Sequence, residues 1–173
     1  MNEFSSPTSV EASPLDAQPF NAQQAPRYDY AVLRQSGHDG GQQSGLYVDC
    51  HGGVFHFDAT DKPLLALRPG SRVSATEWQS IVQSQQALLE QESLQELQRV
   101  ARANALLSNE TLTAPEQQAP HDEQYFFISI DREQHDSEPV IIFQDGDWRR
   151  DNAADEARIV KAFLVNKARK YPV

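Results

Sequence analysis

The stretch from Gly45 to Asp58, "GLYVDCHGGVFHFD", concentrates residue types that active sites use. A cysteine beside a histidine raises the possibility of a nucleophile activated by a base. Two imidazoles with two carboxylates could instead bind an ion such as Zn²⁺. The side chains concerned are Asp49, Cys50, His51, His56 and Asp58, and Cys50 is the only cysteine of the chain.

We interpret this stretch as a β-hairpin with a two-residue turn at Gly52 and Gly53, because glycine accommodates the positive backbone angles of such turns. This register pairs Asp49 with His56. Since side chains alternate between the faces of a strand, one face is apolar and the other is largely polar. The apolar face holds Leu46, Val48, Cys50, Phe55, Phe57 and Ala59, and the other holds Tyr47, Asp49, His51, Val54, His56 and Asp58.

The alternation separates Cys50 from His51, whereas a nucleophilic cysteine needs exposure and a base within reach. We therefore predict that Cys50 is a buried packing residue. The polar face is predicted to be a solvated binding surface on which Asp49 favours protonated His56, without a bound metal or cofactor. Two alternatives stay open, a metal site on this face and an enzyme in which His51 or His56 is a general base oriented by Asp49.

Two other short motifs resemble functional sites but lack residues that those sites require. "DGDWRRDNAADE" has acids at the first, third and twelfth positions of a calcium loop, but Arg150 stands where that loop needs glycine. "HGG" resembles an esterase oxyanion loop, yet no G-x-S-x-G elbow occurs. Trp148, Arg149 and Arg150 form a candidate contact patch, because Trp and Arg are enriched in binding hot spots. The alternative is an edge-strand Trp148 that covers the core.

The charge balance bears on the choice of partner. With 25 acidic and 15 basic residues the formal net charge is −10, which argues against nucleic acid, whose binding depends on clustered Lys and Arg. The basic excess is confined to residues 152–173. An acidic surface elsewhere suits a basic protein partner, or simply keeps the chain in solution.

Composition also predicts the domain organisation. Residues 1–26 are rich in Ser, Pro and Gln with few large apolar residues, so we expect a disordered tail. Residues 27–173 then form a single domain, with an internal linker at 109–124. No signal peptide and no apolar run of about 18 residues is visible, which predicts a cytoplasmic protein without a membrane segment. The tail could alternatively be an export signal.

The elements that position these residues follow from periodicity and caps. Strands are predicted at 28–34, 125–131 and 139–144, with a short edge strand at "DWRR". A capping box at Ser74 to Glu77 begins a long helix toward Ser108. Its apolar stripe slips between Leu89 and Leu94, which indicates a kink or a coiled-coil stutter. A second helix, capped by Asp151 or Asn152, presents Ile159, Val160, Phe163 and Leu164 on one face.

We therefore predict an α+β fold, with an antiparallel sheet of two hairpin units, a long middle helix, and a C-terminal helix packed on the sheet. The favoured function is a non-enzymatic protein-protein interaction module, such as an adaptor, an inhibitor or an assembly subunit. We expect it to form a homo-oligomer or to join a larger assembly. A small enzyme that uses the polar hairpin face, or a secreted effector with an export tail, is the alternative.

Overall fold

The computed structural model describes residues 27–36, 42–58, 88–134 and 138–172. The predicted tail, residues 1–26, lies outside the described residues. So does the predicted helix start at the Ser74 capping box.

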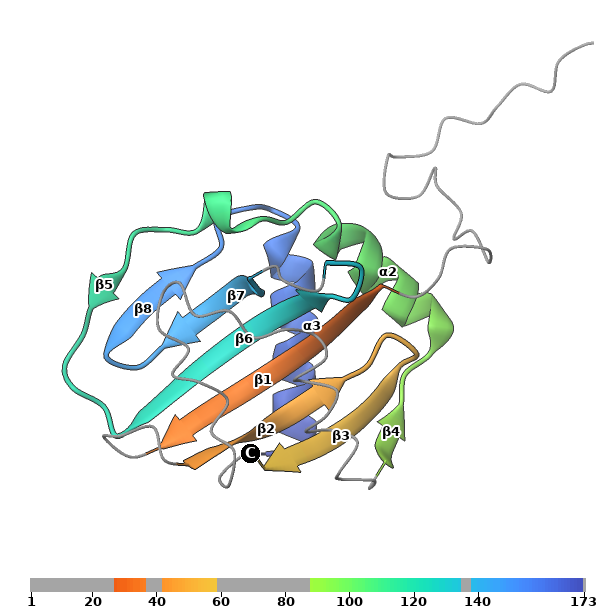
Figure 1. The fold of residues 1–173 in the computed structure, drawn as a ribbon, viewed down its shortest axis with the longest axis horizontal. Helices are drawn as coiled ribbons and strands as arrows, with labels where there is room; N and C mark the ends of the chain where they lie inside the picture. The colour runs from red at the N-terminus through yellow and green to blue at the C-terminus, as the bar shows by residue number, and fades with distance from the viewer. Residues whose placement is uncertain (1–26, 37–41, 59–87, 135–137, 173) are drawn as a thin grey trace, which may run out of the picture.

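The described strands form one antiparallel sheet of eight strands, in the order β4-β3-β2-β1-β6-β7-β8-β5 (Figure 1). With two helices beside this sheet the fold is α+β, as the sequence predicts. The two long strands β1 and β6 pair with each other at the centre of the order. The strands are β1 Tyr28–Ser36, β2 Gln42–Val48, β3 Gly53–Asp58, β4 Leu88–Gln91, β5 Glu116–Gln117, β6 Glu123–Asp131, β7 Val140–Asp145 and β8 Trp148–Asp151.

The helical segments among these residues are α2 Leu94–Asn104, the short 3-10 helix η1 Asn109–Thr111, and α3 Ala157–Lys170. Both α-helices lie behind the sheet in Figure 1. Neither has the length and apolar composition that crossing a membrane requires, within the part of the chain that the structure describes.

The prediction of one helix running on to Ser108 is wrong at Leu88–Gln91, which is strand β4, paired with β3. A new helix begins only at Leu94, where the Ser93 hydroxyl caps it by accepting a hydrogen bond from the Glu96 N–H at 3.2 Å. The slip in the apolar stripe thus marks a change from strand to helix. Pairing with a neighbouring strand overrides the helix propensity of "LLEQ".

The principal core lies between the helices and one face of the sheet, called here the helix face. Val100 of α2 and Val160 of α3 are fully buried against it. The sheet side of this core consists of Tyr30, Val32, Leu46, Val48, Val54, Phe127 and Ile142. Residues on the other face of the sheet are buried as well, in a cluster around Ala31, Leu33, Tyr47 and Phe57 to which neither described helix contributes.

Helix α3 begins later than the predicted cap. Its N-cap position is Glu156, which makes no side-chain capping bond. Asn152 is instead buried and accepts from the Ala154 N–H at 3.2 Å, before the helix begins. The other end of α3 is fastened to strand β4, because Lys167 and Lys170 both form ion pairs with Glu90.

Candidate functional site

The predicted register of the β2–β3 hairpin is wrong. Val48 pairs with Val54 and Leu46 with His56, so Asp49 is not the cross-strand neighbour of His56. The offset from the predicted register is odd, and it therefore moves the phenylalanines to the face opposite Leu46 and Val48. The connection is a longer loop, in which Gly52 has φ +92° and Gly53 already belongs to β3.

The Asp49 side chain helps to hold this longer loop. One carboxylate oxygen, Oδ1, accepts from the backbone N–H groups of both His51 and Gly53, each at 2.9 Å. Asp and Asn commonly shape turns in this way by binding the backbone a few residues on. The carboxylate that the sequence offered as a partner for His56 is thus engaged in holding the loop.

The four polar hairpin residues do not share one surface. His51 is exposed in the loop, and Asp58 is exposed at the end of β3. His56 is half-buried on the helix face, where its ring stands edge-on to Tyr171 at a centroid distance of 6.4 Å. Within the described residues no group of three or more His, Cys, Asp or Glu side chains is placed to hold a metal ion.

Cys50 is buried, with 5% of its surface exposed, and burial raises the pKa of its thiol to about 12. A thiol in this state is a poor nucleophile at neutral pH. Its backbone N–H donates to Asp29 Oδ1 at 2.7 Å. The residue therefore takes part in a network that the sequence did not indicate.

This network is centred on Asp29, which is fully buried on β1. Its Oδ2 accepts from Arg132 Nε at 2.9 Å and from the Tyr47 hydroxyl. Burial raises the pKa of Asp29, and its bonds to Tyr47, Arg132 and the Cys50 N–H act in the opposite direction. All of these donors are supplied by the chain itself, so the network ties β1, β2 and the end of β6 together.

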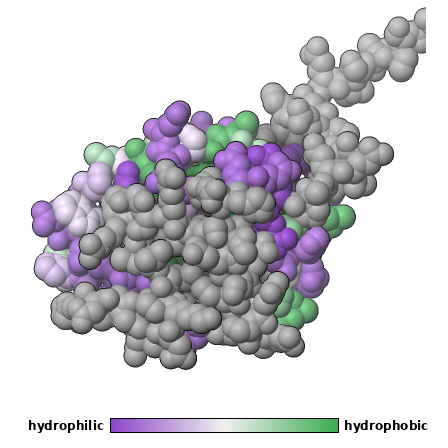
Figure 2. All heavy atoms as spheres, in the orientation of Figure 1, coloured by the Kyte–Doolittle hydropathy of each residue, from purple (hydrophilic) through white to green (hydrophobic). Residues whose placement is uncertain are grey.

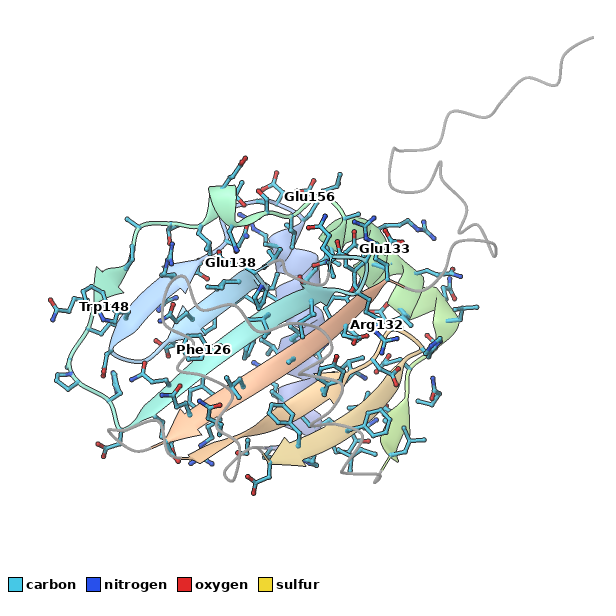
Figure 3. All side chains as sticks on the ribbon, in the orientation of Figure 1. Phe126, Arg132, Glu133, Glu138, Trp148 and Glu156 are labelled. Carbon is cyan, nitrogen blue, oxygen red and sulfur yellow. The ribbon has the colours of Figure 1, made fainter. Side chains whose placement is uncertain are left out.

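Trp148, Arg149 and Arg150 follow one another on β8, and alternation along the strand divides them between two faces. The Arg149 guanidinium lies over the Phe143 ring on the helix face, 5.7 Å from its centroid. Arg150 donates from Nε to the Thr113 carbonyl at 3.2 Å. Trp148 keeps 43% of its surface exposed, and Figure 3 shows it at the β8 edge of the sheet.

Exposed apolar side chains are scattered over the described surface. In the space-filling view, hydrophobic residues reach the surface in separate small patches around the rim, among hydrophilic ones (Figure 2). The large ones that are exposed are Leu88, Leu94, Leu106 and Trp148. Trp148 differs from the three leucines because it stands directly after the β7–β8 turn, where Asp145 lines a cavity.

That cavity is a groove between the end of α3 and the helix face of β1, β6 and β7, with a volume of about 290 Å³. Two rings in its wall, Phe127 and Phe143, pack edge to face at a centroid distance of 5.5 Å. The full lining is Val32, Tyr125, Phe127, Phe143, Asp145, Ala168 and Pro172. We call these seven residues the α3 groove.

Asp145 is the one ionisable carboxylate in the lining of the α3 groove. Its Oδ1 accepts from Gln118 Nε2 at 3.1 Å, a neutral donor. At the rim, Glu123 is engaged by Arg34 and by the Tyr125 hydroxyl, which lowers the pKa of that carboxyl. The groove thus combines an aromatic wall with a half-buried negative charge.

Sequence reasoning missed both the Asp29 network and the α3 groove. Each is assembled from strands that are distant in the sequence, and only the pairing of β1 with β6 brings the two halves together. The one local sequence signal for the α3 groove was the Asp145-Gly146 turn, which Trp148 follows closely. That turn borders the α3 groove.

No family model, curated protein or solved structure matches this chain.

Proposed function

We propose that this chain is a non-enzymatic protein-protein interaction module, an adaptor, an inhibitor or an assembly subunit, that binds its partner around the β7–β8 turn. The α3 groove carries the proposal. Binding sites are typically concave and mainly apolar with a few polar groups that fix orientation, and this groove has that composition. At about 290 Å³ it falls just short of the roughly 300–1,000 Å³ of small-molecule pockets, which favours one or two side chains of a protein as the occupant.

Trp148 extends the proposed surface. Buried tryptophan anchors contribute a large share of the energy in protein interfaces. Trp148 is partly exposed directly after the turn that borders the groove, while Arg149 provides a further polar contact on the helix face. Alternation along β8 places Trp148 on the face of the sheet opposite Arg149 and the groove, so a partner that fills the groove contacts Trp148 only by reaching around the β7–β8 turn.

The proposal includes features that rest on the sequence. We propose a cytoplasmic location, a single domain over residues 27–173 built from two hairpin units, and self-association into a homo-oligomer or a larger assembly. Light scattering coupled to size-exclusion chromatography tests the last point, with a concentration-dependent mass above 19.4 kDa as the expected result. A mass of one chain at every concentration contradicts self-association.

The partner-binding surface is tested on the full chain. A photo-crosslinking amino acid at exposed Gln117, which pairs with Trp148, should capture the partner for identification. Binding of the purified partner is then measured by calorimetry. Trp148→Ala and Ala168→Leu, which fills the groove, should each weaken it by about tenfold or more, as expected for hot-spot residues.

The matched control is Leu106→Ala, because Leu106 is exposed and apolar but lies outside the α3 groove. Its affinity for the partner should stay within about twofold of the unmodified chain. If Trp148→Ala and Ala168→Leu both bind like the unmodified chain, the partner contacts another surface and the proposal fails.

A further inference from the structure

The Asp145 carboxylate in the α3 groove forms no ion pair with any of the described residues. Two cations lie over the ring of the lining residue Phe143, Arg149 and Lys161, and both pair with Asp151, at 3.5 and 2.9 Å. Asp145 is half-buried, so its charge is only partly solvated. A half-buried charge of this kind interacts more strongly with an incoming cation than a fully hydrated one does.

The end of helix α3 adds to the same field. Ala168 and Pro172 form one wall of the groove, and a helix C-terminus carries a partial negative charge from its last carbonyl groups. Of the three basic residues in the last turn, Lys167 and Lys170 reach away to Glu90 on β4, and Arg169 is exposed. The helix end and Asp145 therefore both favour a positive charge within the groove.

The walls determine what can carry that charge. Phe127, Phe143 and Tyr125 present aromatic surface, against which a guanidinium stacks and an aliphatic stem packs. The protein already makes one contact of this kind on a lining ring, because Lys161 Nζ lies 4.0 Å from the Phe143 centroid. A long side chain with an apolar stem and a cationic head matches this lining better than a purely apolar one does.

We infer that the α3 groove receives a single arginine side chain of the partner protein, with its stem against the aromatic wall and its guanidinium on the Asp145 carboxylate. The inference rests on the proposed function and adds the chemistry of the anchor. It also agrees with the net charge of −10, which favours a basic partner. Gln118 keeps Asp145 oriented in the free protein and can remain bonded to it in the complex.

The probe is the capped pentapeptide Gly-Ser-Arg-Ser-Gly, compared with the same peptide carrying norleucine in place of arginine. Each is titrated into the ¹⁵N-labelled full chain and followed by NMR. The arginine peptide should give saturable shifts at the amides of Phe127, Asp145 and Ala168, and bind at least about tenfold more tightly than the norleucine peptide, as expected for a charge-assisted hydrogen bond.

Two variants locate the interaction. Asp145→Asn keeps the shape and an oxygen for Gln118 but removes the charge, and should weaken the arginine peptide by about tenfold or more. Ala168→Leu should also weaken binding of the arginine peptide, because the larger side chain fills part of the groove. The control is Asp155→Asn, which removes one negative charge at an exposed position before α3 and should change the affinity by less than about twofold.

The outcomes separate the two proposals. Equal binding of both peptides, or an unchanged affinity in Asp145→Asn, overturns the arginine anchor while leaving a protein-binding groove in place. Peptide shifts that avoid the groove also overturn the anchor. Failure of both Trp148→Ala and Ala168→Leu to weaken binding of the purified partner overturns the proposed function itself. Dispersed NMR spectra of each variant confirm that it is folded, so that a loss of binding is attributable to the site.

Discussion

Substituting Asp29 with asparagine should destabilise the protein strongly, because the carboxylate is fully buried and serves three donors. It accepts from the Cys50 N–H, from Arg132 Nε and from the Tyr47 hydroxyl. Asparagine has nearly the same shape but offers one acceptor oxygen, and its NH₂ group cannot accept from Arg132. The substitution therefore removes a carboxylate oxygen that accepts from a charged group, without creating a cavity.

The magnitude follows from burial. Removing one partner of a buried ion pair lowers stability by about 3–5 kcal/mol. The Arg132 side chain is 28% exposed, so water takes over part of its solvation. We expect a loss near the lower end of that range, about 3 kcal/mol in the free energy of unfolding.

Asp131→Asn is the matched control at the same end of the sheet. Asp131 also binds an arginine with both oxygens, at 2.9 and 2.8 Å to Arg27, but these side chains are 18% and 38% exposed. Pairs closer to solvent contribute little, so the expected loss is about 1 kcal/mol or less. The two substitutions remove the same chemical group and differ mainly in burial.

The pH dependence of stability provides a second test of the role of Asp29. Burial raises the pKa of Asp29 in the folded protein, so the folded state binds its proton more tightly than the unfolded chain does. The stability that Asp29 contributes is thus fully present below its ordinary pKa of about 3.9, and decreases as the pH rises through the raised value. The loss caused by Asp29→Asn should accordingly be larger at acid pH than at pH 8.

Urea unfolding, followed by tryptophan fluorescence and circular dichroism between pH 4 and 8, measures both effects. A shift of the midpoint without a change in slope identifies a change in stability alone. The reasoning is refuted if Asp29→Asn is no more destabilising than Asp131→Asn, or if its effect grows as the pH rises.

Three further results are expected. Glu90→Gln should weaken the attachment of the end of α3 to β4 and speed amide exchange in β4, while the Lys167–Glu92 ion pair and the Tyr171 hydroxyl on the Leu89 carbonyl remain. The pairing with Lys170 and Lys167 lowers the pKa of Glu90, so its contribution to stability is present above the ordinary pKa and is lost as the pH falls through the lowered value. Gly52→Ala should lower the urea midpoint by an amount equivalent to about 1 kcal/mol or more, because Gly52 has φ +92° and an added Cβ comes within 2.9 Å of Gln91 Nε2. Cys50 should react with a disulfide reagent at pH 8 far more slowly in the folded protein than in urea, because burial raises its pKa to about 12; equal rates would contradict its buried position.

The elements with a continuous local pattern could be predicted from the sequence. The strand at 28–34 corresponds to β1, 125–131 to β6 and 139–144 to β7, each within a few residues. In these segments the apolar residues that determine the strand are the same ones that fill the core. Local strand preference and tertiary packing agree in these segments, so the apolar pattern is sufficient to predict the strands.

Prediction failed where a single side chain or a distant partner decides the structure. At the hairpin, the glycine pair suggested a two-residue turn, but the Asp49 carboxylate binds two backbone N–H groups and lengthens the loop. At Leu88–Gln91 a helix-forming sequence becomes a strand because β3 offers an edge to pair with. The α3 groove could not be predicted because its walls come from three strands and the end of a helix.

The carboxylates of Asp29 and Asp145 lie at opposite ends of the sheet. The difference between them explains why the binding surface is assigned to the β7–β8 turn. Figure 3 shows Arg132 and Trp148 far apart across the sheet, and each marks one of these ends. Asp29, which binds Arg132, is fully buried and accepts hydrogen bonds from donors of the same chain. It therefore stabilises the fold and is not accessible to a partner. Asp145 borders an open groove and holds only one neutral hydrogen bond. A charge that the fold leaves unpaired beside apolar surface is stabilised by a partner that brings the opposite charge, and this difference between the two ends is what the Asp145→Asn experiment measures.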